Sequence, residues 1–350
     1  MQDSGMPKPP SGGTYLVDPQ DAYPHEPESV SNYNESMYFS VFDVPKMCGL
    51  WFRLGNRPNE GYAERTVCIY LPDGSVAFQA GRPSITHNRE MAAGGLRFEI
   101  IEPFEHKRAT FDGDVVLLRD PTVMANPSRA FKDHPHVRAR FELDFTASSP
   151  VIGGRPLNAD GTEHVPAEAS FGRAHFDQFM HGSGWIEIDG KRTELDGFGD
   201  RDHTWGPRYW QSIDAYRWVH VQFGPDLAFL FTINWRKVPD REVSGVVFRD
   251  GEFYDVVDAT VDSDWDADFH HRSLRATVTT DREQFELTGK VHSLIPLRNR
   301  REFEGAVKVT RITEAMTEYR LGDRIALGMS EYLDQIVDGR PIGPDLEASV

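Results

Sequence analysis

A run of fourteen residues, Gly197–Trp210 (GFGDRDHTWGPRYW), holds an unusual concentration of titratable and aromatic side chains that could do chemistry. It combines acids, arginines, a histidine and large aromatic rings between glycines and a proline. Such side chains are costly to bury unless their polar groups find partners. If the run is extended, alternation places Arg201, His203 and Trp205 on one face, which offers a cation, a proton carrier and an indole. The alternative is a structural corner whose charges satisfy one another.

The opposite face of the same strand carries the carboxyl groups of Asp200 and Asp202. Burial would raise the pKa of either one and make it an acid able to protonate an alkene, with His203 handling the returning proton. Arg201 would instead lower these pKa values and could bind a substrate carbonyl or carboxylate while His203 abstracts a proton. A bulge after Gly199 would let Asp202 orient the His203 imidazole, and we expect one. The candidate catalytic residues are His203, Asp202, Asp200, Trp205 and Arg201.

The composition narrows the class of protein. The chain has 38 basic and 55 acidic side chains, and its net charge of −17 repels nucleic acid and anionic lipid surfaces. Its 350 residues allow one large or two medium domains. No apolar run approaches the roughly 20 residues of a membrane helix, and the N-terminus shows no secretory signal pattern. Because Cys48 and Cys68 form no CxxC pair, we expect a cytoplasmic protein with two free thiols.

No motif indicates a cofactor or a metal. The glycine-rich patterns of dinucleotide and nucleoside triphosphate sites are both absent. The pairs at His134 and His136 and at His270 and His271 lack complementary ligands, and Asp262–Asp268 lacks the glycine and glutamate of a calcium loop. We therefore expect no cofactor and no metal. The partner we expect is a hydrophobic small molecule, with no nucleic acid and no membrane span, and the chain could form a homodimer.

Short apolar runs with turn pairs between them indicate antiparallel β-sheets. Runs such as Val67–Leu71 and Phe141–Phe145 are rich in β-branched and aromatic residues. The turn pairs that separate such runs are Asp73-Gly74, Asp112-Gly113, Asp189-Gly190 and Asp250-Gly251. Helical periodicity is scarce, and we expect short helices only around His175–Met180 and beyond Glu331. Residues 1–30 are rich in Pro, Gly, Ser and acids and predict a flexible arm that is partly attached at Tyr15 and Leu16.

The clearest hairpin is Ala215–Lys237, in which Gly224-Pro225-Asp226 separates two alternating arms. The first arm has a polar and aromatic face and an apolar face, which suits a barrel that holds a ligand. The residues that we expect to bind the substrate are Gln178, Tyr209, Trp210, Trp218, His220, Glu331 and Tyr332.

The segment Asp200–Arg208 (DRDHTWGPR) resembles the Arg-Asp-His-(Ser/Thr)-Trp-Gly signature of the carotenoid 1,2-hydratase and AttH-like group. Supporting pieces are Gln178–Gly190 (QFMHGSGWIEIDG), the LDGFG run just before the signature, and Tyr319–Gln335 (YRLGDRIALGMSEYLDQ). The resemblance implies two lipocalin-like antiparallel β-barrels in tandem, over residues 31–195 and 196–350. The group is also related to lipocalin-like Diels–Alderases.

The resemblance also carries an expectation about function. Members of the group include alkene hydratases and cofactor-free cyclases, which act on hydrophobic substrates. His203 and Trp205 match the group's active-site histidine and tryptophan at the junction of the two barrels. The following strand, Leu227–Trp235 (LAFLFTINW), has no aspartate where the hydratases place their acid.

These observations predict an all-β protein of two lobes with a ligand pocket between them. The function that we expect is a cofactor-independent enzyme acting on a terpenoid, steroid or polyketide-like molecule. Its reaction would be hydration or dehydration, isomerisation or cyclisation, which makes it a lyase or an isomerase. The alternative is a non-catalytic carrier of a hydrophobic ligand, which needs an apolar lumen and no cluster of titratable groups.

Overall fold

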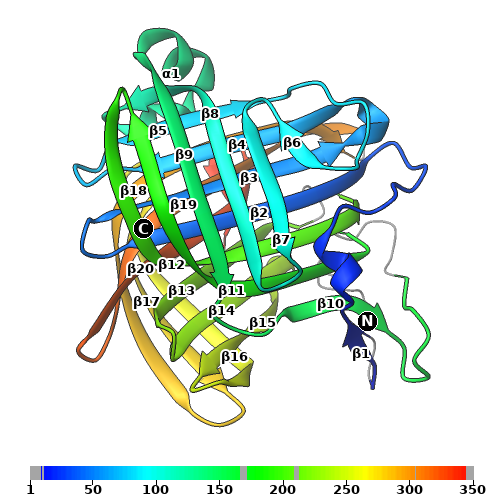
Figure 1. Cartoon of the computed structure of the whole chain (residues 1–350). Helices are drawn as coiled ribbons and strands as arrows, with labels where there is room; N and C mark the ends of the chain where they lie inside the picture. The colour runs from blue at the N-terminus through cyan, green and yellow to red at the C-terminus, as the bar shows by residue number, and fades with distance from the viewer. Residues whose placement is uncertain (1–8, 10–11, 166–171, 209–212, 304, 344–350) are drawn as a thin grey trace.

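The computed structural model describes residues 9, 12–165, 172–208, 213–303 and 305–343. Strands make up 69% of it and helices 6%, so the prediction of an all-β, tandem lipocalin-like fold is confirmed. Figure 1 shows the two lobes, with the strands of the first lobe in blue to green and those of the second in green to red. Among the described residues, no helix is both long enough and apolar enough to cross a membrane.

The first lobe is one large antiparallel sheet, in the order β1-β10-β11-β12-β2-β3-β4-β5-β8-β7-β6, with β9 paired to both β8 and β11. Its strands are β1 (Thr14–Leu16), β2 (Tyr33–Asp43), β3 (Cys48–Arg57), β4 (Tyr62–Tyr70), β5 (Val76–Gly81), β6 (Met91–Ala93), β7 (Leu96–Glu102), β8 (His106–Leu118), β9 (His136–Ala147), β10 (Ile152–Leu157), β11 (Ala174–Ile188) and β12 (Lys191–Pro207).

Strand pairing carries the first sheet around a core. The end of β8 pairs with β5, β9 joins β8 to β11, and β12 returns to β2. The inward side chains of these strands form one apolar cluster, in which Phe39, Phe52 and Phe141 are each at most 1% exposed. The lobe also carries three 3-10 turns and one short helix: η1 (Pro19–Ala22), η2 (Pro58–Glu60), η3 (Pro121–Ala125) and α1 (Pro127–Asp133).

The second lobe is an antiparallel barrel of eight strands, which is closed because β13 pairs with β20. A second apolar cluster fills it, with Val219, Phe229 and Phe231 fully buried. Its strands are β13 (Ala215–Gly224), β14 (Leu227–Lys237), β15 (Asp240–Arg249), β16 (Glu252–Trp265), β17 (His271–Thr280), β18 (Gln284–Phe303), β19 (Ala306–Leu321) and β20 (Arg324–Val337), and β21 (Arg340–Pro341) adds to β20.

Local turn chemistry places several of these strands. Asp189-Gly190 has φ angles of 51° and 77°, the left-handed conformation that a tight hairpin requires, and it joins β11 to β12. The predicted hairpin Ala215–Lys237 is confirmed as β13 and β14. The turn predicted at Asp112-Gly113 is wrong, because this pair lies inside β8, where Gly113 stays in register with β9.

Both expected helices are wrong. Residues around His175–Met180 belong to β11, and those from Glu331 to Val337 belong to β20, while residues 344–350 lie outside the described part of the chain. Both strands lie between two neighbours, and most of their side chains are buried on both faces. A strand buried on both faces loses the period-two alternation that distinguishes it from a helix in the sequence.

The expected boundary between residues 195 and 196 falls inside β12, which lies wholly in the first sheet. The chain reaches the second lobe only after Pro207, where β13 begins at Ala215. Within the described residues, the expected N-terminal arm is attached to the first lobe, beginning at Tyr15 and Leu16, where attachment was expected. Thr14–Leu16 pairs with β10, and Arg155 forms ion pairs with Asp18 and with Asp21, the latter at 3.3 Å.

A third apolar cluster joins the lobes. It includes Phe42 and Trp51 of the first lobe and Met316 and Met329 of the second, each at most 3% exposed. Gln222 of β13 donates hydrogen bonds to backbone carbonyls of the first lobe, one of them on Met180 at 3.0 Å. This packing fixes the walls of the space between the lobes.

Candidate functional site

A cavity of about 160 Å³ lies between the two lobes. Strands β2, β3, β4 and β12 supply its walls from the first lobe, and β13, β14 and β18–β20 supply them from the second. Strand alternation turns every second side chain of these strands toward the cavity. The prediction of a pocket between two lobes therefore has a matching space in the structure.

Aromatic rings form one wall of the cavity. The Tyr38 ring stacks with Trp51 at 5.9 Å between centroids and meets the edge of Trp218 at 5.6 Å. His220 lies beside them, 4.7 Å from the Trp218 ring and with Nε2 3.5 Å from the Tyr38 hydroxyl. Burial lowers the pKa of His220 to about 3, so its imidazole stays neutral. This wall offers π faces and few charges to a ligand.

Two carboxyl groups face the cavity from the second lobe. Glu314 on β19 and Glu331 on β20 are direct partners across the strands, and both line the cavity. They are only 5% and 7% exposed, and burial raises the pKa of each to about 8. Both are therefore largely protonated near neutral pH. The Tyr216 hydroxyl donates to Glu331 Oε1, while Glu314 Oε2 has no hydrogen-bond partner among the described residues.

Charged groups of the first lobe complete the lining. Arg53 Nε donates to Ser36 Oγ at 2.8 Å, and its Nη1 lies 3.4 Å from Glu64 Oε2. Burial, reinforced by the neighbouring Arg53, lowers the pKa of Arg208 to about 10, so this group stays cationic. Of the six signature residues Asp200–Trp205, only Asp202 lines the cavity.

Strand β12 separates the signature residues onto two faces. Its register with β11 is unbroken from Ala174↔Trp205 to Ile188↔Lys191, so alternation holds through the whole signature. The bulge expected after Gly199 is therefore wrong. The glycine serves a close approach instead, because a Cβ there would collide with the Ser40 carbonyl of β2.

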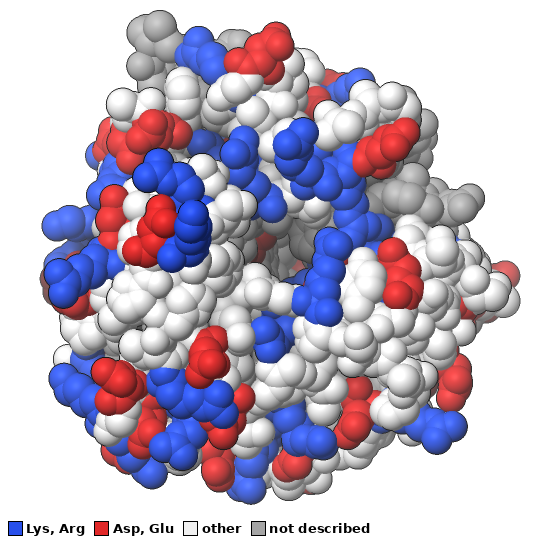
Figure 2. All heavy atoms as spheres, turned by 90° about the horizontal axis from the view of Figure 1, so that it is seen from above, with Lys and Arg blue, Asp and Glu red and all other residues white. Residues whose placement is uncertain are grey.

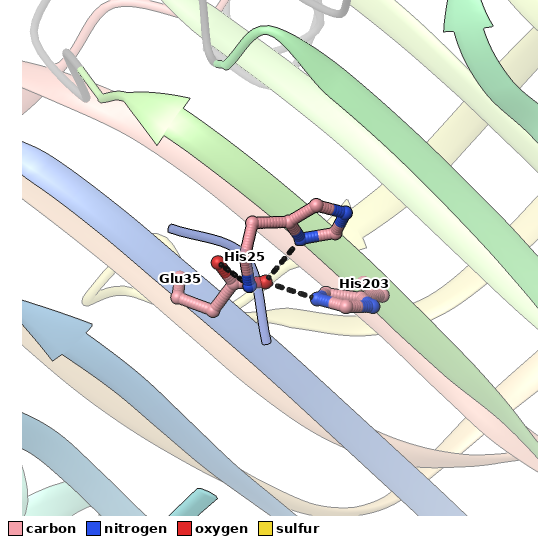
Figure 3. Close-up of side chains that lie close together, drawn as sticks. All are labelled: His25, Glu35 and His203. Carbon is pink, nitrogen blue, oxygen red and sulfur yellow. Dashed lines mark hydrogen bonds and ion pairs between the residues drawn. The ribbon is translucent and has the colours of Figure 1, made fainter. Parts of the chain in front are cut away.

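His203 points away from the cavity, into a buried contact with the N-terminal segment (Figure 3). Its Nε2 lies 2.5 Å from Glu35 Oε1, and both side chains are fully buried. His25 Nδ1 lies 3.0 Å from the same oxygen. The other oxygen, Oε2, accepts hydrogen bonds from the Tyr33 hydroxyl at 2.8 Å and from Asn88 at 3.2 Å. Glu35 is thus the carboxylate that orients His203, the role that we expected of Asp202.

The charges in this contact follow from its geometry. Burial opposes ionisation of Glu35, but the bonds from His203 and His25 outweigh it and lower its pKa to about 2. Burial also opposes protonation of His25, but Asp21 and Glu35 raise its pKa to about 9. Burial lowers the pKa of His203. The contact therefore pairs a carboxylate with one charged and one neutral imidazole.

The other signature residues also leave the cavity. Trp205 stacks on His25 at 3.9 Å and lines a separate surface pocket. Arg201 lies inside the first lobe, 4.5 Å from the Phe176 ring. Asp200 is fully buried, and burial beside other acids raises its pKa well above the usual range.

Two clusters could offer ligand atoms to a metal ion. One is His25, Glu35 and His203, and the other is His175, Asp177 and Asp202. In the first, each candidate ligand atom is already within hydrogen-bonding distance of another member. In the second, His175 Nε2 lies 2.7 Å from Asp177 Oδ2.

The expected substrate-binding residues are divided. Trp218 and Glu331 line the cavity, and His220 lies against its aromatic wall. Gln178 faces the first lobe instead, where its amide donates to the carbonyl of Ser149 at 2.9 Å. Tyr332 points into the second barrel, where its ring stacks on His271 at 3.8 Å. Tyr209 and Trp210 lie outside the described residues.

The structure brings three residues that the sequence did not single out to the cavity or to the His203 contact: Glu314, Arg53 and Glu35. Glu314 had a signal, because it stands alone among apolar and small residues in Ile312–Met316. A lone acid in such a run is costly to bury unless it is hydrogen-bonded, paired or kept neutral by a raised pKa, so its presence indicates a specific role. Glu35 and Arg53 had no such signal in the local sequence, since their partners lie far along the chain.

The comparisons agree on the class of protein. An AttH protein of Nitrosomonas europaea superposes with a TM-score of 0.57 at 12% identity, covering 92% of this chain and 97% of the other. CghA in complex with Sch210972 gives a TM-score of 0.54 at 10% identity, covering 95% and 97%. The chain is therefore a tandem lipocalin-like protein with the AttH fold, as its resemblance implied. Identities this low establish the fold alone.

The family is established by sequence. A family model described as a domain of unknown function, DUF7064, matches residues 18–336, and the chain belongs to this family. No curated protein sequence matches the chain.

Proposed function

We propose that this protein is a cofactor-independent enzyme that transfers a proton to a hydrophobic small molecule in the cavity between the lobes. The observation that carries the proposal is the pair of protonated carboxyl groups, Glu314 and Glu331, facing an aromatic cavity. The substrate class is a terpenoid, steroid or polyketide-like compound with a double bond. The reaction is hydration, dehydration, isomerisation or cyclisation.

The acid pair supplies what alkene chemistry needs. A carboxyl group with a pKa near the working pH can give up its proton and take one back within a single turnover. Glu331 donates its proton to one alkene carbon and becomes a carboxylate, which the Tyr216 hydroxyl stabilises by its hydrogen bond. The carboxylate then recovers a proton from the attacking water in hydration, or from a neighbouring C–H bond in isomerisation. Glu331 therefore gives up one proton and recovers one in each turnover, and no cofactor is needed.

The rest of the cavity suits the cation that forms on the substrate. The π faces of Trp51 and Trp218 can stabilise positive charge, by on the order of 1 to 2 kcal/mol when water is excluded. Thr232 and Asn234 of β14 also line the cavity and could hold a single water for attack. These two belong to the strand in which the hydratases place their aspartate, so the acid here comes from β19 and β20 instead.

One structural neighbour supports the choice of ligand class. CghA shares this fold and has been crystallised with Sch210972. A protein of this architecture therefore holds a small molecule, and the aromatic wall of the present cavity suits a hydrophobic one.

The test uses the purified full chain in D₂O with a panel of unsaturated terpenoids, steroids and prenylated phenols. Every reaction in which Glu331 protonates an alkene carbon leaves a solvent deuteron on carbon, whereas dehydration sends the proton to the leaving oxygen and shows as loss of water. Mass spectrometry detects both changes. We expect deuterium in the product of at least one compound that binds. Compounds that bind in the cavity and come back unlabelled and unconverted would make the protein a carrier and would overturn the proposal.

A further inference from the structure

Positive charge is gathered on one face of this acidic chain. The chain carries a net charge of −17, yet Figure 2 shows Lys and Arg side chains gathered around a hollow on the face seen from above. An isolated basic region on an acidic protein attracts anions locally, because nearby charges act more strongly than distant, screened ones.

The arginines next to the cavity converge on one carboxylate. Glu64 on β4 receives Arg53 at 3.4 Å, Arg57 at 3.2 Å and Arg301 at 3.1 Å. Three guanidinium groups share this single acid, and Arg57 has Glu60 as its one further acidic partner among the described ion pairs. The described ion pairs of this cluster thus bring three guanidinium groups to two carboxylates, those of Glu64 and Glu60. Arg57 is fully buried, so its positive charge lies inside the fold and not on the solvent-exposed surface.

The positive group continues into the cavity. Arg53 belongs both to the Glu64 cluster and to the cavity lining, and Arg208 lines the cavity beside it. The cavity's acids do not cancel this charge, since Glu314 and Glu331 hold their protons near neutral pH. Asp202 is the one other acid of the described lining.

Arginine is the side chain best suited to hold an oxyanion. Its planar guanidinium donates two parallel hydrogen bonds to a carboxylate or a phosphate, and such charge-assisted bonds are about twice as strong as neutral ones. A substrate that is hydrophobic over most of its length and anionic at one end would match the aromatic wall with its skeleton and the arginines with its end group.

We propose that the substrate carries an anionic group, a carboxylate or a phosphate, which Arg53 and Arg208 bind while its hydrophobic skeleton lies against Trp51 and Trp218 beside Glu331. This inference rests on the proposed function, because it assigns the end group of the molecule that the cavity converts. Binding of the anionic end group also explains how the uncharged double bond of the substrate is held in one orientation toward Glu331.

The experiment compares three probes of equal chain length: dodecanoate, dodecyl phosphate and dodecanol. Binding to the full chain is measured by calorimetry at low and at high salt. We expect at least one anionic probe to bind about tenfold more tightly than the alcohol, with the advantage shrinking as salt rises. The stronger of the two anions identifies the end group as carboxylate or phosphate.

Three variants locate the effect. Arg301→Gln removes a cation from the Glu64 cluster at a side chain that is 26% exposed, and it should reduce the anion's advantage. Arg282→Gln is the matched control, since it removes a surface arginine that pairs with Glu252 on the second lobe, and it should change nothing. Thr232→Trp fills the cavity and should abolish binding of all three probes.

The outcomes separate this inference from the function on which it rests. Equal affinity for dodecanol and both anions overturns the anionic end group and leaves a hydrophobic cavity in place. An anion advantage that survives undiminished in Arg301→Gln also overturns it, as does one that Arg282→Gln reduces equally. If none of the three probes binds, both the inference and the proposed function are overturned. The same follows if the probes bind Thr232→Trp as tightly as they bind the parent.

Discussion

Glu314 and Glu331 are direct partners across β19 and β20, and their buried carboxyl groups line the same cavity. Like charges opposite one another in a sheet are destabilising when both are ionised. The pair is tolerated because burial raises both pKa values to about 8 and keeps the protons in place. This feature distinguishes the site from an ordinary apolar ligand pocket, which has no need of acids.

The pH profile of turnover follows from this pair. The folded-state pKa of Glu331, about 8, lies above its ordinary value of 4.5, so the active, protonated form persists up to about pH 8. We predict that kcat is flat on the acidic side of that value and falls as the pH rises through it. Initial rates measured at constant ionic strength check this. A rate that rises through about pH 8 would show that the carboxylate, not the acid, is the active form.

Part of this organisation could be predicted from local sequence. The alternating arms of Ala215–Lys237 and the Gly224-Pro225-Asp226 turn define a hairpin by themselves, and β13 and β14 confirm it. The face of β12 that meets the second lobe could not be predicted. Alternation separates Asp202 from His203, but only the long-range pairing of β12 with β2 decides which of them reaches the cavity.

The same limit applies to the acids. Glu314 and Glu331 are seventeen positions apart, and their pairing depends on the β19–β20 register. Glu35 meets His203 across 168 positions. Contacts of this kind come from the closing of the sheets, which no local pattern records.

We predict that His203 stabilises the first lobe and does not take part in the chemistry. His203→Ala removes a buried hydrogen bond to the Glu35 carboxylate and should lower the free energy of unfolding by about 2 to 3 kcal/mol. Ligand binding in the cavity should hold, because the side chain lies on the other face of β12. Urea denaturation and calorimetry check both. His203→Gln retains a donor and should lose less. A fall in kcat of several decades at unchanged stability would restore a catalytic role.

Docking of the N-terminal segment should depend on pH. The folded-state pKa of His25, about 9, lies above its ordinary value of 6.5. Its contribution to stability is therefore complete below about pH 6.5 and is lost as the pH rises through about 9. Limited proteolysis within residues 14–30 should accelerate across that range. His25→Asn should remove the dependence, whereas the exposed His87→Asn should keep it. Equal cleavage rates at both ends of the range would contradict the prediction.

We predict that a buried lysine in the first lobe lowers the stability of the fold. Lys107 is fully buried, and its Nζ lies 5.8 Å from the centre of the Phe104 ring but has no hydrogen-bond partner among the described residues. Burial, together with the nearby Arg201, lowers its pKa from 10.5 to about 6. The free-energy cost of burying the charged Lys107 side chain is absent above about pH 10.5 and grows as the pH falls toward 6. Lys107→Met should stabilise the protein at neutral pH by about 1 to 3 kcal/mol, with a smaller gain near pH 10.

Chemical denaturation at the two pH values checks the Lys107 prediction. Lys132→Met, at an exposed position of α1, is the control and should change little. Destabilisation by Lys107→Met at both pH values would mean that the ammonium group has a stabilising partner inside the lobe.

The central claim is that the acid pair moves the proton, and one comparison tests it most directly. Glu331→Gln and Glu314→Gln keep the size of each side chain and remove its proton, while Glu318→Gln changes a surface acid of β19 that pairs with Arg320. Turnover and binding are measured for the compound that the parent labels with deuterium. We predict that kcat falls by roughly two to four decades in Glu331→Gln or Glu314→Gln, with affinity within about threefold of the parent and Glu318→Gln unchanged. Parental turnover in both cavity variants would contradict the claim.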